Sequence, residues 1–206
     1  MRFFLILFVC AALAGCFSVE YELLRQPAPT RISYYNGSEE RYADGSMKKC
    51  RLKDTASIGL YKCVGWIHFF PNGDVDNFET AAPVKYSRYE IPPNSRIFFY
   101  DNAHDKIKTV WFPEDIKLDG IECQGGEKIS VDFYENGSLK ACFLSRNQTI
   151  QGFPCKSSLF SPVYFYPDGR IMRLTLCSDA ISGANSFAKG ETLVVTESGV
   201  PSVYKK

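Results

Sequence analysis

The sequence predicts an all-β repeat protein in which consecutive antiparallel β-hairpins form a meander sheet, with units of about 32 residues. Three observations lead to this fold class. A short phrase rich in apolar and aromatic residues recurs along the chain, most copies end in a turn signal such as Asn-Gly or Asp-Gly, and no stretch after residue 31 shows helical periodicity. The aromatic content of 15% also favours β-structure.

The recurring phrase has the pattern of a strand followed by a tight turn. In the copy at residues 131–137, Val131 and Phe133 have the two-residue spacing of a strand with one buried face. Asn136 and Gly137 then supply two residues that tolerate positive φ, the strongest short hairpin signal. Other copies stand at residues 32–37, 67–73, 97–102, 163–169 and, in degenerate form, 193–199.

A second strand is predicted after each turn. In the copy at residues 138–144, apolar residues stand two, five and seven positions after Gly137, at Leu139, Cys142 and Leu144. The second and fifth positions differ in parity, so a regular strand could not bury both on one face. We therefore predict a bulge or a kink between Leu139 and Cys142. Counterparts of this phrase begin at Ser46, Asp74, Lys106 and Arg170.

A third phrase closes each unit and predicts one short strand. It reads Leu-Asp-Gly-Ile-Glu-Cys at residues 118–123 and Ile-Gln-Gly-Phe-Pro-Cys at residues 150–155. An odd number of strands would reverse successive units of a meander. We therefore expect the third phrase and the next first phrase to form one long, bent strand. The closing residue recurs at spacings of 28, 32, 32 and 32, which marks one structural position: Cys63, Ile91, Cys123, Cys155 and Phe187.

The first residues have the pattern of an export signal. A basic start at Arg2 precedes an apolar run that ends near Phe17, too short for the roughly 20 residues of a transmembrane helix. Leu13-Ala-Gly-Cys16 resembles the bacterial lipobox. That resemblance implies removal of residues 1–15 and diacylation of the Cys16 thiol; an ordinary signal with a chance cysteine is the alternative. Residues 16–31 are expected to be the lipidated N-terminus and a tether, and residues 32–206 the repeat domain.

Lipidation would place the chain at a membrane, since two acyl chains give stable anchoring. Phe17 follows the cysteine, where many inner-membrane lipoproteins carry Asp, so we expect a lipid-anchored protein of the bacterial cell envelope at the outer membrane. Removal of residues 1–15 leaves 23 basic and 23 acidic side chains. This balance argues against nucleic acid as a partner.

The Phe-Tyr-Glu-Asn-Gly-Ser-Leu-Lys stretch at residues 133–140 resembles the MORN-variant repeats of bacterial proteins, some of them labelled antitoxin-like. The resemblance covers most of residues 32–199 as diverged copies. It implies consecutive antiparallel hairpins and a role in interaction, and it supplies no active site.

Six cysteines remain in the expected mature chain. In an exported protein, disulfides within a repeat would pair Cys50 with Cys63 and Cys142 with Cys155; buried free thiols are the alternative. No zinc motif or calcium loop stands in the sequence, and its two histidines, His68 and His104, have no partner at acid–base spacing.

An aromatic residue stands just before each turn, at Phe70, Tyr100, Tyr134 and Tyr166. These side chains either shield the second face of the sheet or form a binding ridge for a protein or glycan partner. We therefore expect a binding or scaffolding module without catalysis, cofactor or metal. A secreted glycan-processing enzyme and an antitoxin-like protein that neutralises a partner are the alternatives.

Overall fold

The protein's structure, a computed structural model, describes the backbone of residues 18–23, 30–101 and 103–204 and the side chains of residues 31–101 and 105–204. Throughout these residues the regular structure is β-strand, with no helix. The predicted all-β meander of consecutive hairpins is confirmed. Residues 1–15 and Cys16 lie outside the described residues.

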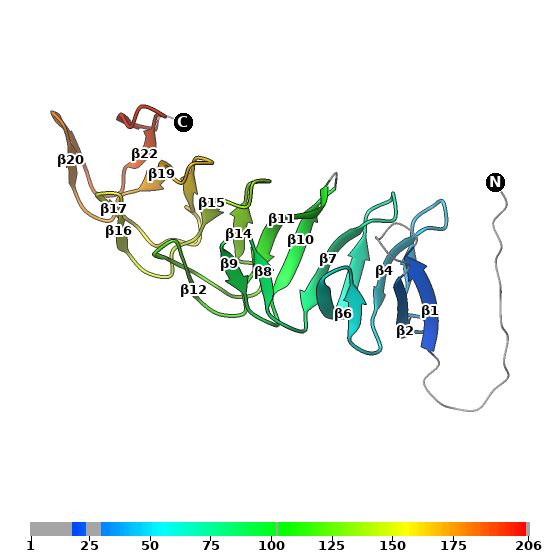
Figure 1. Ribbon diagram of the computed structural model, residues 1–206. Helices are drawn as coiled ribbons and strands as arrows, with labels where there is room; N and C mark the ends of the chain where they lie inside the picture. Colours follow the sequence, from blue (N-terminus) through cyan, green and yellow to red (C-terminus); the bar gives the residue numbers. More distant parts are fainter. Residues whose placement is uncertain (1–17, 24–29, 102, 205–206) are drawn as a thin grey trace, which may run out of the picture.

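One large sheet runs through the whole array, which is elongated and curved (Figure 1). Twelve of its strands follow one another as antiparallel neighbours, and β5 (Ala56–Ile58) pairs separately with one of them. In sheet order the twelve are β3 (Glu40–Arg41), β4 (Met47–Arg51), β6 (Tyr61–Phe69), β7 (Val75–Thr80), β10 (Arg96–Tyr100), β11 (Ala103–Trp111), β14 (Ser130–Phe133), β15 (Leu139–Cys142), β18 (Val163–Phe165), β19 (Ile171–Thr175), β22 (Thr192–Val195) and β23 (Pro201–Val203).

Short hairpins stand between the long ones, so most units have four strands where the sequence predicts three. The strand of the third phrase pairs with a strand immediately before it. With four strands, an even number, each unit starts in the same direction as the unit before it. The third phrase and the next first phrase therefore do not need to form one continuous strand. The expected long, bent strand occurs at β6, whereas later units have separate strands. The short hairpins are β8 (Val84–Tyr86) with β9 (Tyr89–Ile91), β12 (Ile116–Leu118) with β13 (Ile121–Cys123), β16 (Gln148–Ile150) with β17 (Phe153–Cys155), and β20 (Ala180–Ser182) with β21 (Asn185–Phe187).

The N-terminal boundary differs from the expected one. A strand, β1 (Ser18–Leu23), lies inside the segment for which the sequence predicts a tether, and it pairs with β2 (Thr30–Tyr35). An isolated bridge between Tyr34 and Leu52 connects this hairpin to the rest of the array. The β-structure therefore begins before residue 32.

The core lies between the main sheet and the short hairpins. Phe133 of β14 is fully buried, and the rings of Tyr86 and Tyr89 from an earlier short hairpin lie 5.7 and 5.5 Å from its centroid. The closing residues of the third phrase are all buried, as a single structural position requires: Cys63, Ile91, Cys123, Cys155 and Phe187.

The bulge predicted after the long turns is present. Phe133 pairs with Leu139 and Asp132 with Ala141, so Lys140 is the extra residue and both Leu139 and Cys142 stay buried. The turn itself differs from the expectation, because Gly137 has a φ of 79° while Asn136 is not among the residues with positive φ. The turns with two positive-φ residues are instead in short hairpins, as at Asp119-Gly120 and Gln151-Gly152.

Candidate functional site

The predicted aromatic ridge connects neighbouring hairpins. The hydroxyl groups of Tyr100, Tyr134 and Tyr166 donate hydrogen bonds of 2.8–2.9 Å to a backbone carbonyl of the next unit. The acceptors are the carbonyl oxygens of Phe133, Phe165 and Val195. Tyr42, which the sequence analysis did not single out, makes the same contact with Phe69. Phe70 occupies an equivalent position without a hydroxyl group.

The rings of these tyrosines are also partly covered. Lys108, Lys140 and Arg170 place their cationic groups 6.0, 5.5 and 6.0 Å from the ring centroids of Tyr100, Tyr134 and Tyr166, respectively. These distances are typical of cation–π contacts. The ridge side chains therefore have intramolecular contacts on the hydroxyl and on one ring face, which leaves less of each ring for a partner.

The six cysteines are free thiols in the structure. Cys50, Cys63, Cys142 and Cys155 are buried and none is joined to another. Burial raises the pKa of Cys50, Cys63 and Cys155 to about 12. A hydrogen bond to Cys123 of the preceding unit, together with burial, raises the pKa of Cys142. These thiols are thus protonated, and weakly nucleophilic, at neutral pH.

The described residues contain no helix long and apolar enough to cross a membrane. Within the same residues, no group of three or more His, Cys, Asp and Glu side chains is placed to hold a metal ion. His68 is half-buried on β6, and burial, reinforced by the Arg96 charge, lowers its pKa. The side chain of His104 lies outside the described part of the chain.

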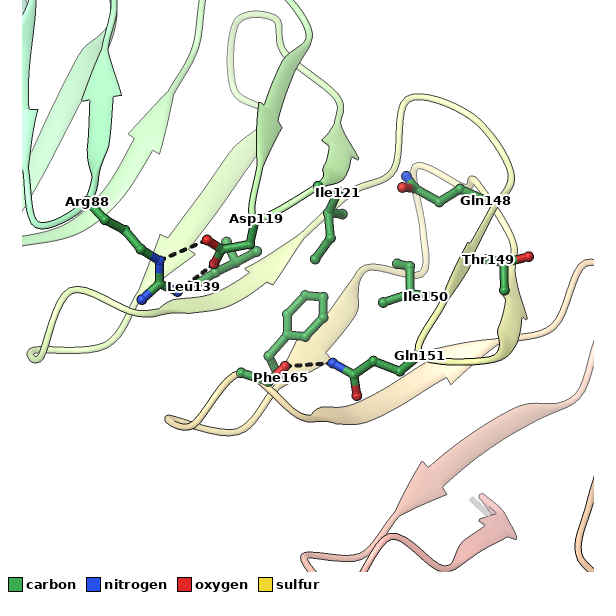
Figure 2. Close-up of a pocket in the computed structure, with 11 residues that line it drawn as sticks. Arg88, Asp119, Ile121, Leu139, Gln148, Thr149, Ile150, Gln151 and Phe165 are labelled. Carbon is green, nitrogen blue, oxygen red and sulfur yellow. Dashed lines mark hydrogen bonds and ion pairs between the residues drawn. The ribbon is translucent and has the colours of Figure 1, made fainter.

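A pocket of about 390 Å³ lies between the short hairpins β12–β13 and β16–β17 (Figure 2). Its apolar wall consists of Ile121, Leu139, Ile150 and Phe165. An ion pair between Arg88 and Asp119 borders it on one side, and Gln148, Thr149 and Gln151 border it on the other.

The repeats explain why this pocket exists. In the preceding unit Tyr86 and Tyr89 pack on Phe133, but the equivalent positions 32 residues later are Leu118 and Ile121. Aliphatic side chains replace two rings there, and they leave the space above Leu139 and Phe165 incompletely filled.

Most of the polar side chains around this pocket already have partners. Both carboxylate oxygens of Asp119 accept hydrogen bonds from Arg88, at 2.8 and 2.5 Å, and Tyr89 donates to the same carboxylate. The Arg88 guanidinium holds the pKa of the Asp119 carboxyl below its usual range. Gln151 bonds the backbone of Gly169 and Ile171.

The apolar walls are also well covered, since Ile121, Leu139, Ile150 and Phe165 are each at most 8% exposed. A ligand would remove little further apolar surface from water. This pocket is therefore a gap in packing that offers a ligand little binding energy.

The opposite face of the main sheet offers more accessible aromatic surface, and we call it the open face. One residue from each strand of the path from β4 to β23 forms a row across it through continuous cross-strand pairing. Most of these side chains are half-buried or exposed. The row is Lys49, His68, Asn77, Phe98, Thr109, Asp132, Ala141, Tyr164, Arg173, Val194 and Ser202.

An aromatic pair marks the middle of this face. The rings of Phe98 on β10 and Trp111 on β11 lie 4.7 Å apart between centroids and are tilted by 56°. A hollow of about 280 Å³ beside them is bordered by Phe70, Asp76, Phe98, Phe99, Asp101, Lys108, Thr109 and Trp111. A second hollow of about 350 Å³ is bordered by Glu79, Asn94, Arg96, Trp111, Phe112, Pro113, Gly126 and Glu127. Trp111 borders both, and we call Phe98, Trp111 and the two hollows the Trp111 platform.

Polar side chains next to the platform form a connected chain. Arg96 donates two hydrogen bonds to the amide oxygen of Asn77, at 2.9 and 2.5 Å. The amide nitrogen of Asn77 donates to Asp76 at 2.9 Å. The neighbouring Thr109 hydroxyl donates to Asp132 at 2.7 Å.

The sequence analysis missed this platform. The one signal that could have found it is the comparison of repeats at positions outside the core. No protein-family model, curated protein or solved structure matches the chain.

Proposed function

We propose that this protein is a lipid-anchored protein of the bacterial envelope that binds a partner through the surface of its repeats. The observation that carries the binding role is the Trp111 platform, because half-buried aromatic rings beside charged and amide groups are typical of binding surfaces. Anchoring rests on the resemblance of residues 13–16 to a lipobox, with Cys16 as the acylated residue and the outer membrane as the destination.

The binding role is tested with the full-length protein in detergent and with fragments of cell envelope. We expect cosedimentation of the wild type and its loss in W111A. I181A is the matched control, since Ile181 is 82% exposed on a short hairpin away from the open face. Equal cosedimentation of W111A and wild type, or none for any variant, would contradict the role of the open face.

The anchor is tested separately by fractionation of cells. C16A should give an uncleaved or a soluble product without acyl chains. A mature-sized, acylated band of this variant in the membrane fraction would show that the lipobox interpretation is wrong.

A glycan-processing enzyme is the second candidate, and one observation favours it. Asp76 and Asp101 border the same hollow beside Phe98. Two carboxyl groups in one cleft are the usual requirement of glycosidases. Release of reducing ends from a glycan by the purified protein, with loss of this activity in D76N or D101N, would support the enzyme over the binding module.

A further inference from the structure

We propose that the Trp111 platform binds an uncharged oligosaccharide, with one sugar ring in each hollow and the indole of Trp111 as their shared wall. This inference rests on the proposed binding role and names its ligand. The three features that carry it are the specialisation of one repeat, the polar groups around the rings, and the balance of charge.

The repeats act as internal controls for the platform. The position of Phe98 holds His68, Asp132 and Tyr164 in sibling units, and the position of Trp111 holds Glu79, Phe143 and Thr175. Folding of the repeat therefore does not require an aromatic ring at either position. By contrast, the buried residue just before Trp111, Val110, has apolar or thiol side chains as its counterparts: Cys50, Phe78, Cys142 and Leu174. The aromatic pair thus has no role that the other units need.

Sugar rings combine an apolar face of C–H groups with a rim of hydroxyls that both donate and accept hydrogen bonds. The Phe98 and Trp111 rings supply flat apolar surface at the centre of the platform. Donors and acceptors alternate beside them, from the Asp76 carboxylate through the Asn77 amide to the Arg96 guanidinium. These groups hold one another in place before a ligand arrives, which lowers the entropy cost of binding.

The charges around the platform select against anionic ligands. Each hollow is bordered by two carboxylates and one cation: Asp76 and Asp101 with Lys108 in the first, and Glu79 and Glu127 with Arg96 in the second. Net negative charge repels phosphates, sulfates and nucleic acid, whereas carboxylates accept hydrogen bonds from neutral hydroxyls.

The chain offers a direct optical test, because Trp66 and Trp111 are its two tryptophans. In full-length W66F the emission reports on Trp111 alone. We expect chitohexaose or cellohexaose to shift or quench this emission in a saturable way, and the polyanion heparin to have no such effect. Calorimetry on W111A, which keeps Trp66, should show binding weakened by about tenfold or more. The circular dichroism spectrum should stay unchanged, since Trp111 is half-buried on the open face.

The failure of this inference is distinguishable from the failure of the proposed function. Protease-treated envelope fragments should still retain the protein, and an excess of the neutral hexasaccharide that binds should release it from them. If W111A reduces cosedimentation but the binding is protease-sensitive, the partner is a protein and the oligosaccharide inference is wrong. Saturable binding of heparin, or no response to either neutral hexasaccharide, overturns it as well.

Discussion

At the scale of single residues, the tyrosine hydroxyls are the most regular side-chain contacts of the array. Tyr42, Tyr100, Tyr134 and Tyr166 each donate to a carbonyl of the next unit. Burial raises the pKa of Tyr100 and of Tyr134, so both stay protonated as donors at neutral pH. Each hydroxyl therefore couples two hairpins that are otherwise joined by backbone pairing.

Y134F should lower the free energy of unfolding by about 1 kcal/mol, because the Phe165 carbonyl loses its hydroxyl partner. Y164F is the matched control, since the Tyr164 hydroxyl lies on the open face and makes no hydrogen bond among the described residues. Urea denaturation measures both changes. Equal effects of the two substitutions would contradict the structural role of the ridge.

F70Y tests the same contact by adding a hydroxyl group at the one ridge position that lacks it. Phe70 is the member of the ridge without a hydroxyl, and the equivalent acceptor is the carbonyl of Phe99 in the next unit. A new hydrogen bond there should raise the free energy of unfolding by up to about 1 kcal/mol. A lower midpoint of urea denaturation for F70Y than for wild type would show that the position cannot accept the hydroxyl.

His68 gives the stability a dependence on pH. Burial and the charge of Arg96 lower its pKa in the folded state, so the unfolded chain binds the proton more readily. Stability should then rise with pH through the interval between the lowered pKa and the ordinary value near 6.5, and fall on acidification through that interval. H68Q should flatten the profile of thermal melting between about pH 5 and pH 7.5. An unchanged slope in H68Q would assign the dependence to other groups.

At the scale of elements, the short hairpins are the part that the sequence analysis resolved least well. Their strands are three residues long, which is too short to show the two-residue alternation of apolar and polar side chains. Their turns hold Ser87, Asp119 and Gln151 at positive φ, where glycine would have been the usual signal. The dipeptides Asp119-Gly120 and Gln151-Gly152 could have indicated these turns. The long hairpins were predictable because each has alternating core residues and a conventional turn.

Packing between a short hairpin and a long one can be measured at two equivalent glycines. Gly137 and Gly169 both have a φ near 80°, so an alanine at either position should cost roughly 1 kcal/mol in backbone strain. A Cβ on Gly137 would also lie 2.8 Å from the Cβ of Ser87, whereas one on Gly169 would meet nothing within 4 Å.

We therefore expect G137A to lower the free energy of unfolding more than G169A does. The double variant S87G/G137A should recover the difference, because glycine suits the positive φ of Ser87 and removes the clash. Urea denaturation of G137A, G169A and S87G/G137A measures these differences in the free energy of unfolding. Equal losses for G137A and G169A would mean that the Ser87 turn does not pack on the Gly137 turn in solution.

At the scale of the whole molecule, the sequence predicted the class of the array and its consecutive long hairpins, but neither the fourth strand of most units nor the Trp111 platform. Core positions such as Val131 and Phe133 repeat in every unit, so their role could be recognised by comparison. Phe98 and Trp111 do not repeat, and only the pairing of β10 with β11 brings their rings together. Such a platform can be recognised from the sequence only by comparing the repeats at positions outside the core, where Phe98 and Trp111 differ from most of their counterparts.

The last hairpin should act as a cap. Removal of residues 193–206 would delete β22 and β23, expose the backbone of β19 as a sheet edge, and remove the Val195 carbonyl that Tyr166 contacts. We expect the truncated protein to associate into dimers or larger species in size-exclusion chromatography with light scattering. A monomeric, equally stable truncated protein would contradict the capping role.

Each unit adds two strands to the main sheet, so the length of the array depends on the number of its units. Neighbouring strands are about 4.8 Å apart, so each unit lengthens the sheet by about 10 Å. Duplication of a unit ahead of β10 would carry the platform one such step farther from the N-terminal end, and duplication after β11 would leave that distance unchanged. The distance between the platform and the N-terminal end can therefore be altered in fixed increments while the residues of the platform stay the same.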